Sequence, residues 1–344
     1  MGTLYVDRKG IHVRLDGNAL AFYRNGEREG TVPIFPLKRV VVTGNITIES
    51  SVLCKLADQN VTVIFLSGRR MKFHGMLHGR LHSNGILRIR QFEKSLLGKK
   101  DARSFAVHFS FDLIGRKIQN QIDFLNEALA RRPDLRFPLK SSIEKISRIN
   151  DKLRLIKTEF EKDSQADPQA ILELLRGYEG SAAASYFSGY TELFPPSLMF
   201  WNRNRRPPQD PVNSMLSLCY TLIHYEMVRE IETIGLDPTI GFYHQFEYGR
   251  ESLACDMVEL FRQEVDRFVW AIFRDRHFTA RDFLIDKERS CCYLKKQARS
   301  RFYPLYEEWA KKKRPLFTEE VRALARNILG EEWEIYEGQN ALSE

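Results

Sequence analysis

Residues 106–129 read AVHFSFDLIGRKIQNQIDFLNEAL, and this stretch marks a change in the character of the chain. Its apolar residues recur at steps of three and four, which is the period of one helix face: Phe109, Leu113, Ile114, Ile118, Ile122 and Leu125. The same period predicts further helices over residues 141–160, 168–186, 213–234, 252–273 and 318–328. We therefore predict that the chain is helical from about residue 91 onward.

The chain before residue 90 has the character of short strands instead. Apolar and β-branched runs at 4–6, 12–15, 20–23, 31–35, 39–42 and 61–66 are separated by polar residues. Asp16-Gly17 and Asn25-Gly26 favour tight hairpin turns, because these residues accept a positive φ. One short helix is expected at 50–58, with Ser50 near its cap. The prediction is an α+β protein, with a small β-domain at 1–90 and a larger all-helical domain at 91–344.

The net charge of +8 lies entirely in the first quarter of the 344 residues. Residues 1–95 contain 15 Lys and Arg against 7 Asp and Glu, whereas the rest of the chain contains 38 of each. Such an asymmetry favours a polyanionic partner, with nucleic acid ahead of a membrane surface. Within this segment, Arg69, Arg70 and Lys72 are candidate contacts to backbone phosphate.

The composition excludes several classes of protein. A hydrophobic share of 43% and a charged share of 28% are ordinary for a globular protein and exclude a disordered or collagenous chain. No run approaches the ~18 apolar residues that a membrane span needs, and the N-terminal residues lack an apolar signal core, so a cytoplasmic protein is expected. The absence of a Gly-x-x-x-x-Gly-Lys loop and of a Gly-x-Ser-x-Gly elbow argues against a nucleotide-driven motor and a serine hydrolase.

Two stretches could carry metal or acid–base chemistry. Glu179 lies among small residues that leave room for a ligand, although a solvated helix glutamate is the simpler interpretation from its surroundings alone. His244 precedes a predicted helix that carries Asp256 and Glu259 three residues apart on one face, with Ser252 as a suitable N-cap. One imidazole and several carboxylates suit Mg²⁺ or Mn²⁺. A capped amphipathic helix with solvated acids explains the spacing equally well.

A third candidate is the series His74, His78 and His82, which are four residues apart. Gly75 and Gly79 interrupt a helix here, and the stretch contains no acid. Histidines at even spacing also share one face of a strand. A polar strand face or a phosphate contact is therefore favoured over a metal site.

Four sequence blocks in the C-terminal half resemble a known family. They are RGYEG at 176–180, RNRRPPQDPVN at 203–213, GLDPTIGFYH at 235–244 and GRESLACDMVELFR at 249–262. In this order they resemble the CRISPR-associated endonuclease and integrase of the adaptation module, which inserts new spacers. The resemblance extends over most of the chain, from about residue 4 to residue 301, and it is looser in the N-terminal part.

The resemblance implies a site with one divalent metal ion, Mg²⁺ or Mn²⁺. Glu179 matches the first ligand position of the family, His244 the second and Glu259 the third, while Asp256 matches a neighbouring acid. The spacing of Asp256 and Glu259 does not rank them as ligands. Glutamate has the longer reach toward His244, and helical side chains lean toward the N-terminus, so both arguments favour Glu259.

The resemblance also implies the reaction and the partners. In integration, the 3′-hydroxyl of a captured double-stranded DNA fragment attacks a phosphodiester of the CRISPR repeat, and in hydrolysis water attacks. The helical domain would be catalytic, and the β-domain would serve dimerisation and DNA backbone contacts. A homodimer would bind a second, small adaptation protein, and Arg205, Arg206 and Arg250 would contact DNA near the active site. The alternatives are a branched-DNA repair endonuclease with the same metal site and a non-catalytic DNA-binding scaffold.

Overall fold

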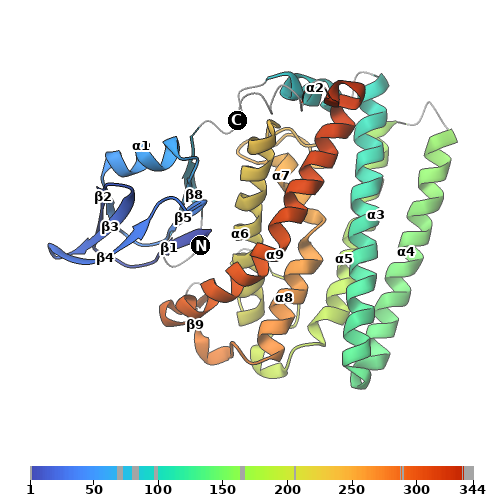
Figure 1. The fold of residues 1–344 in the computed structure, drawn as a ribbon. Coiled ribbons are helices and arrows are strands. Elements are labelled where there is room, and N and C mark those ends of the chain that lie inside the picture. Colours follow the sequence, from blue (N-terminus) through green and yellow to red (C-terminus); the bar gives the residue numbers. More distant parts are fainter. Residues whose placement is uncertain are drawn as a thin grey trace. The chain divides into compact units, whose positions relative to one another are not determined.

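A computed structural model describes residues 2–67, 73–79, 85–96, 100–162, 167–204, 207–286, 288, 290–334 and 336. Contacts divide the chain into two compact units (Figure 1). Unit 1 contains Met1–Asn84 and Ser300–Lys312, and unit 2 contains Gly85–Arg299 and Lys313–Glu344. Each unit is described separately.

Unit 1 contains two four-stranded sheets. In the first, the order is β1 (Thr3–Val6), β5 (Arg39–Val42), β7 (Thr62–Leu66) and β8 (Phe73–Leu77), of which the first three are parallel and β8 is antiparallel. In the second, the order is β4 (Glu27–Pro33), β3 (Ala19–Arg24), β2 (Ile11–Asp16) and β6 (Thr47–Ile48). Each apolar run expected to be a strand overlaps one of these elements.

The hairpins of the second sheet turn at the expected residues. Gly17 joins β2 to β3 with a φ of 58°. Asn25 and Gly26 join β3 to β4 with φ values of 51° and 87°, and a two-residue hairpin loop with both residues at positive φ matches the twist of the strands. The predicted turns are therefore confirmed by their backbone conformation.

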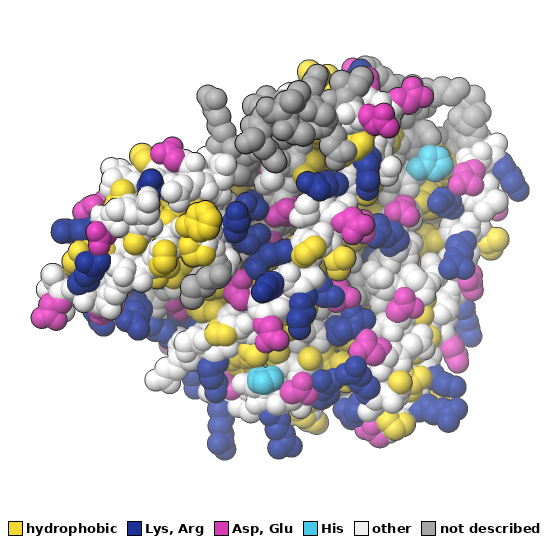
Figure 2. All heavy atoms as spheres, in the orientation of Figure 1, with side chains coloured by type: hydrophobic (Ala, Val, Ile, Leu, Met, Phe, Trp, Pro, Cys, Tyr) yellow, Lys and Arg dark blue, Asp and Glu magenta, His cyan; other side chains and the backbone are white. Residues whose placement is uncertain are grey.

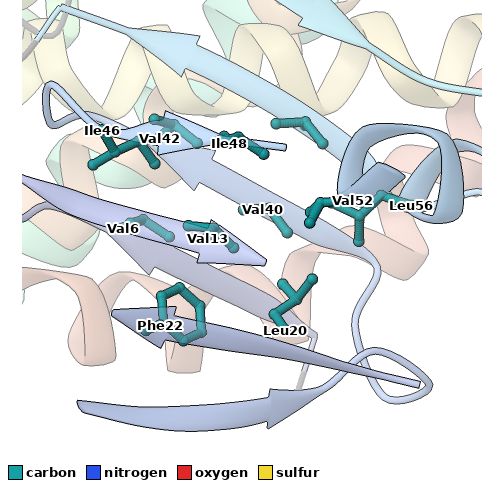
Figure 3. Close-up of a pocket in the computed structure, with 11 residues that line it drawn as sticks. Val6, Val13, Leu20, Phe22, Val40, Val42, Ile46, Ile48, Val52 and Leu56 are labelled. Carbon is teal, nitrogen blue, oxygen red and sulfur yellow. The ribbon is translucent and has the colours of Figure 1, made fainter. Parts of the chain in front are cut away.

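Hydrophobic side chains from both sheets and from one helix form the core cluster of unit 1. The helix α1 (Ser50–Asp58) buries Val52 and Leu56, and its cap position is Glu49 rather than Ser50. Figure 3 shows these two side chains and those of Val6, Val13 and Val40 directed into one small gap. All residues that line the gap are hydrophobic, so it belongs to the packing of the core and offers nothing to a polar ligand.

Unit 2 is mostly helical, but it is not all-helical as predicted, because it contains a two-stranded hairpin. Its elements are α2 (Ile86–Ser95), α3 (Lys100–Arg131), α4 (Arg136–Lys162), α5 (Pro168–Thr191), α6 (Pro211–Ile234), α7 (Ser252–Glu259), α8 (Arg262–Arg274), the hairpin of β9 (Phe283–Asp286) and β10 (Cys291–Leu294), and the last part of α9 (Lys296–Leu329). Helices α3, α4 and α5 pack on one another, and α6 packs on α7 and α8 (Figure 1). The predicted α+β class is confirmed.

Side-chain caps and glycine set the ends of these helices. Asp167 is the N-cap of α5 and accepts a hydrogen bond from the Gln169 N–H at 3.1 Å, and Pro168 takes the first helical position. At the end of α6, Gly235 has a φ of 101°, and the Leu236 N–H donates to the Ile231 carbonyl at 3.0 Å. In the described part of the chain, no helix is both long and apolar enough to cross a membrane.

The single helix predicted over residues 252–273 is wrong, because the chain breaks between α7 and α8. Phe261 leaves the helical conformation, with φ −114° and ψ 3°. Its ring packs edge-on against Phe317 at a centroid distance of 4.6 Å. Asn120 donates to the Leu260 carbonyl at 3.3 Å and so satisfies an end group of α7. Glu259 is consequently the last residue of α7.

Candidate active site

The four acid and imidazole residues predicted for the site all lie in unit 2. Glu179 is on α5, His244 is in the loop between α6 and α7, and Asp256 and Glu259 are on α7. The structure pairs them in a specific way. Asp256 contacts His244 directly, whereas Glu179 and Glu259 are joined through Lys117 of α3.

The buried carboxylate of Asp256 holds the loop that carries His244. One oxygen, Oδ2, accepts hydrogen bonds from the N–H groups of Phe242 at 2.8 Å and Tyr243 at 3.1 Å. The other, Oδ1, accepts from the His244 N–H at 2.9 Å and from its ring Nδ1 at 2.7 Å. Because Nδ1 donates to Asp256, the ring presents Nε2 as its free acceptor. With four donors around it, Asp256 is suited to positioning His244.

The start of α7 closes this loop in a way that the sequence did not indicate. Ser252 was predicted as the N-cap, but the cap position is Glu251, and Ser252 Oγ donates to the Gln245 carbonyl at 3.0 Å. Gly241 lies against the same residues, since a Cβ there would stand 2.6 Å from the His244 carbonyl oxygen and 2.8 Å from Ser252 Cβ. Only glycine fits at position 241 without displacing His244.

Glu179 and Glu259 share one cation, the ammonium group of Lys117. Its Nζ contacts Glu179 Oε1 and lies 2.5 Å from Glu259 Oε2. The side chains of Lys117 and Glu259 are 6% and 4% exposed, and that of Glu179 is 22% exposed. Lys117 and Glu259 Oε2 form an ion pair, but the angles of this contact are not those of a hydrogen bond. Among the described residues, this buried oxygen therefore has no hydrogen-bond donor. Tyr243 O–H donates to Glu179 Oε2 at 2.7 Å.

The charges around Glu259 keep it ionised. Burial alone would raise its pKa, but the charges of Arg262 and Lys117 lower the pKa of Glu259 well below its usual range. Arg262 Nε lies 2.7 Å from Glu259 Oε1. Tyr243 behaves in the opposite sense, because burial and the nearby Glu179 raise the pKa of its hydroxyl well above the usual value. Tyr243 therefore remains a neutral donor beside an anion.

A second buried polar cluster adjoins the first through Arg262. Asp266 of α8 accepts hydrogen bonds from the hydroxyls of Tyr186, at 2.9 Å, and Tyr220. Burial raises the pKa of Asp266 to about 6. The guanidinium groups of Arg262 and Arg203 lie 4.8 and 5.5 Å from the centroid of the Tyr220 ring. Arg262 thus contacts Glu259 on one side and an aromatic face on the other, which fixes it in the packed interior.

The donor set fits a divalent cation in its chemistry. Two carboxylates and an imidazole nitrogen are ligands that Mg²⁺ or Mn²⁺ accepts, and the two carboxylates already share a cation. Within the described ranges, no group of three or more His, Cys, Asp or Glu side chains is gathered closely enough to hold a metal ion. The reason is visible in the contacts, since Lys117 lies between Glu179 and Glu259 while His244 is engaged with Asp256.

Of the six predicted DNA contacts, Arg250 is among the described residues. Arg69, Arg70, Lys72, Arg205 and Arg206 lie outside the described residues. Arg250 lies in the loop after His244, and its Nη1 pairs with Glu247 Oε2 at 2.8 Å. On the face drawn in Figure 2, Lys and Arg side chains are interspersed with Asp and Glu.

The histidine series at 74–82 has no metal-like arrangement where it is described. His74 is exposed on β8, and His78 Nδ1 lies 2.8 Å from the Gly79 carbonyl oxygen. His82 lies outside the described residues.

Three residues of the site were not predicted: Lys117, Tyr243 and Arg262. Lys117 had a detectable signal, because it lies among the buried apolar residues Leu113, Ile114 and Ile118 of α3. A buried lysine on a helix face needs an anionic partner. Its partners Glu179 and Glu259 are far away in sequence, so only the fold identifies them.

Comparisons with known proteins show which family the chain resembles over most of its length. Residues 4–308 match the family model of the CRISPR associated protein Cas1. A relative from Thermodesulfovibrio yellowstonii, named a CRISPR-associated endonuclease Cas1, is 50% identical over 331 residues, which cover 96% of this chain and 98% of the relative. A Cas1 protein from Thermotoga maritima has a similar structure, with a TM-score of 0.78, 22% identity and coverage of 96% of this chain and 97% of that one.

A casposase bound to integration product also shares the fold, with a TM-score of 0.76 and 20% identity, over 96% of this chain and 91% of the casposase. At these identities the two structures support the fold alone. The family model and the 50% identical relative confirm the resemblance found in the sequence blocks. The chain belongs to the Cas1 family of CRISPR-associated proteins.

Proposed function

We propose that the endonuclease and integrase activity of this Cas1 protein resides at Glu179, His244 and Glu259, which together hold one Mg²⁺ or Mn²⁺ ion. Asp256 acts as a positioning residue that orients His244 through its ring Nδ1. The protein inserts new spacers into a CRISPR array by attack of a 3′-hydroxyl on a phosphodiester. Catalysis is assigned to residues 91–344, and dimerisation and backbone contacts with DNA are assigned to residues 1–90.

The observation that carries this proposal is the cation shared by Glu179 and Glu259. Two carboxylates from different helices converge on one buried positive charge. Carboxylates that lie this close are stable only when a cation compensates them. His244 follows Tyr243, whose hydroxyl donates to Glu179 Oε2 at 2.7 Å, so the loop that carries the imidazole is joined to Glu179.

Each side chain has a defined part in the reaction. A divalent ion in this site would withdraw charge from the scissile phosphate and lower the pKa of the attacking hydroxyl. Glu179 and Glu259 supply anionic oxygens, and His244 supplies Nε2 because Asp256 occupies Nδ1. Tyr243 orients Glu179 by donating its hydroxyl hydrogen. The attacking group is the 3′-hydroxyl of the incoming fragment or water, so no covalent enzyme intermediate is needed.

The partners follow from the same activity. Double-stranded DNA is the substrate, both as the captured fragment and as the CRISPR repeat. Phosphate contacts are assigned to Arg250 and to the basic residues at 69–72 and 205–206. A homodimer and a second, small CRISPR-associated adaptation protein complete the assembly, and we place the reaction in the cytoplasm.

The test is a strand-transfer and cleavage assay with single variants of the three ligands. Glu179→Gln, His244→Ala and Glu259→Ala should each abolish both activities while DNA binding and dimerisation persist. Glu264→Gln is the matched control, since Glu264 is a partly buried acid that pairs with Lys313 at 2.6 Å in the same unit. Cleavage of branched DNA without any strand-transfer product would indicate a repair nuclease instead. A protein that binds DNA equally well with and without Mn²⁺ and cleaves none of it would be a scaffold.

A further inference from the structure

We propose that Lys117 is a resident counter-ion of the Glu179–Glu259 pair, and that a divalent metal ion must displace its ammonium group in order to bind. Lys117 would then set the metal concentration at which the site is loaded. This inference rests on the proposed function, because it takes Glu179 and Glu259 as metal ligands. It concerns a residue for which the sequence blocks predicted no role.

The ammonium group of Lys117 lies between the two acids. Lys117 Nζ contacts Glu179 Oε1 and lies 2.5 Å from Glu259 Oε2, so one point charge serves two acids. Its side chain is almost completely buried. A lysine this deep in a helical unit is stable only with anionic partners, and these acids are equally dependent on a cation. Together with Arg262, which lies 2.7 Å from Glu259 Oε1, these side chains carry two positive and two negative charges.

The ammonium group and a metal ion bound by these carboxylates would compete for the same space. Mg²⁺ takes carboxylate oxygens at about 2.0–2.1 Å, and a lysine nitrogen pairs with them at about 2.7–2.9 Å. An ion bound by Glu179 Oε1 and Glu259 Oε2 would therefore overlap Nζ, which contacts both oxygens. Two cations so close together would also repel each other strongly in a buried site. Metal binding and the Lys117 contact are mutually exclusive.

Among the partners of the two acids, Lys117 is the one that can move away. Glu259 keeps Arg262 at 2.7 Å, and Arg262 is fixed against the face of Tyr220. Glu179 keeps the Tyr243 hydroxyl at 2.7 Å. Each acid thus retains one oriented partner on its other oxygen. Lysine carries its charge on a flexible four-carbon stem, which can swing aside, whereas a planar guanidinium held by stacking cannot do so as readily.

The prediction is that removing the competing charge strengthens metal binding. Lys117→Met keeps the length and apolar stem of the side chain but leaves the two carboxylates without their shared cation. Mn²⁺ binding should then become about 10-fold tighter or more, which corresponds to ~1.4 kcal/mol or more. The metal-free variant should unfold at a lower temperature than the wild type, and saturating Mn²⁺ should restore most of this loss.

The experiment is calorimetric titration of Mn²⁺ into the full-length protein, with thermal unfolding measured on the same samples. Lys117→Gln serves as a second uncharged variant in case Lys117→Met does not fold. Lys117→Arg keeps the positive charge and should bind Mn²⁺ no more tightly than the wild type. Lys313→Met removes an equivalent pair with Glu264 and should leave the Mn²⁺ affinity unchanged.

The outcomes separate this inference from the proposed function. If the wild type binds Mn²⁺ and an uncharged variant at 117 binds it equally or more weakly, Lys117 is not a competitor and the inference is overturned. If the wild type binds no Mn²⁺ and Glu259→Ala behaves identically, the metal site itself is wrong. Tighter binding confined to the uncharged variants at 117 supports the inference, because a purely structural lysine would not show it.

Discussion

Asp256→Asn tests how the loop at the active site is held. Asparagine has nearly the same shape as aspartate, but it replaces one carboxylate oxygen by an NH₂ group. Each oxygen of Asp256 accepts two hydrogen bonds, from Phe242 and Tyr243 on one side and twice from His244 on the other. If the NH₂ group faces Phe242 and Tyr243, it opposes two N–H donors in a fully buried position; if it faces His244, it opposes the backbone N–H, and the ring Nδ1 as long as that nitrogen is protonated.

The expected size of the effect follows from those two lost bonds. A hydrogen bond to a charged group contributes about 1.5–3 kcal/mol, so the loop loses at most ~3–6 kcal/mol of local stabilisation. Relaxation of the loop will recover part of this. A displaced orienting carboxylate typically lowers metal affinity by about 10–100-fold, and Mn²⁺ affinity and strand-transfer rate should fall by that order. Glu259→Ala should instead abolish Mn²⁺ binding.

The assay is calorimetric Mn²⁺ titration of both variants, with thermal unfolding as the check on folding. Asp237→Asn is a matched control, since Asp237 also accepts hydrogen bonds within this segment, from Thr239 N–H and Oγ at 2.8 and 2.6 Å, but does not contact His244. An Asp256→Asn protein with unchanged Mn²⁺ affinity would refute the positioning role. Complete loss of metal in Asp256→Asn, with retention in Glu259→Ala, would reverse the assignment of the two acids.

Two further predictions concern charge and pH. Replacing the three basic residues within 69–72 should flatten the salt dependence of DNA binding by roughly one unit of slope per lost contact, and an unchanged slope would locate the DNA elsewhere. Burial lowers the pKa of His224, but hydrogen bonds with Cys255 and Glu251 raise it to about 9. This raised pKa adds stability that is complete below pH ~6.5 and disappears as the pH rises through about 9. His224→Gln should therefore remove up to about 3 kcal/mol of the pH dependence of the unfolding free energy. Parallel plots of unfolding free energy against pH for the wild type and the variant would contradict this prediction.

The sequence predicts the elements whose signals are local. The strands of unit 1 and the helices α3 to α6 follow from the period of their apolar residues, and Asp167 and Gly235 mark helix ends by hydrogen bonding and positive φ. Helix α9 extends well beyond the predicted residues 318–328. The local pattern does not predict this length, since Pro304 and Pro315 in its interior argue against a helix. The break at Phe261 depends on its packing against a distant ring, which no local pattern contains.

The same distinction applies to the site. Spacing puts Asp256 and Glu259 on one helix face, but it cannot show that Asp256 faces the loop of His244 while Glu259 faces Lys117. The sequence does not identify the partners of Lys117, because its contacts bridge α3, α5 and α7. Local sequence therefore identifies the candidate ligands, and tertiary contacts decide which of them share one cation.

The most direct test of the central claim is anomalous diffraction from crystals of the protein grown with Mn²⁺. One strong peak is expected at ligand distance, about 2.0–2.3 Å, from a carboxylate oxygen of Glu179, a carboxylate oxygen of Glu259 and Nε2 of His244, with Asp256 still bonded to Nδ1. A peak coordinated by Asp256 in place of Glu259, or a protein active in strand transfer whose only Mn²⁺ lies away from these residues, would contradict it.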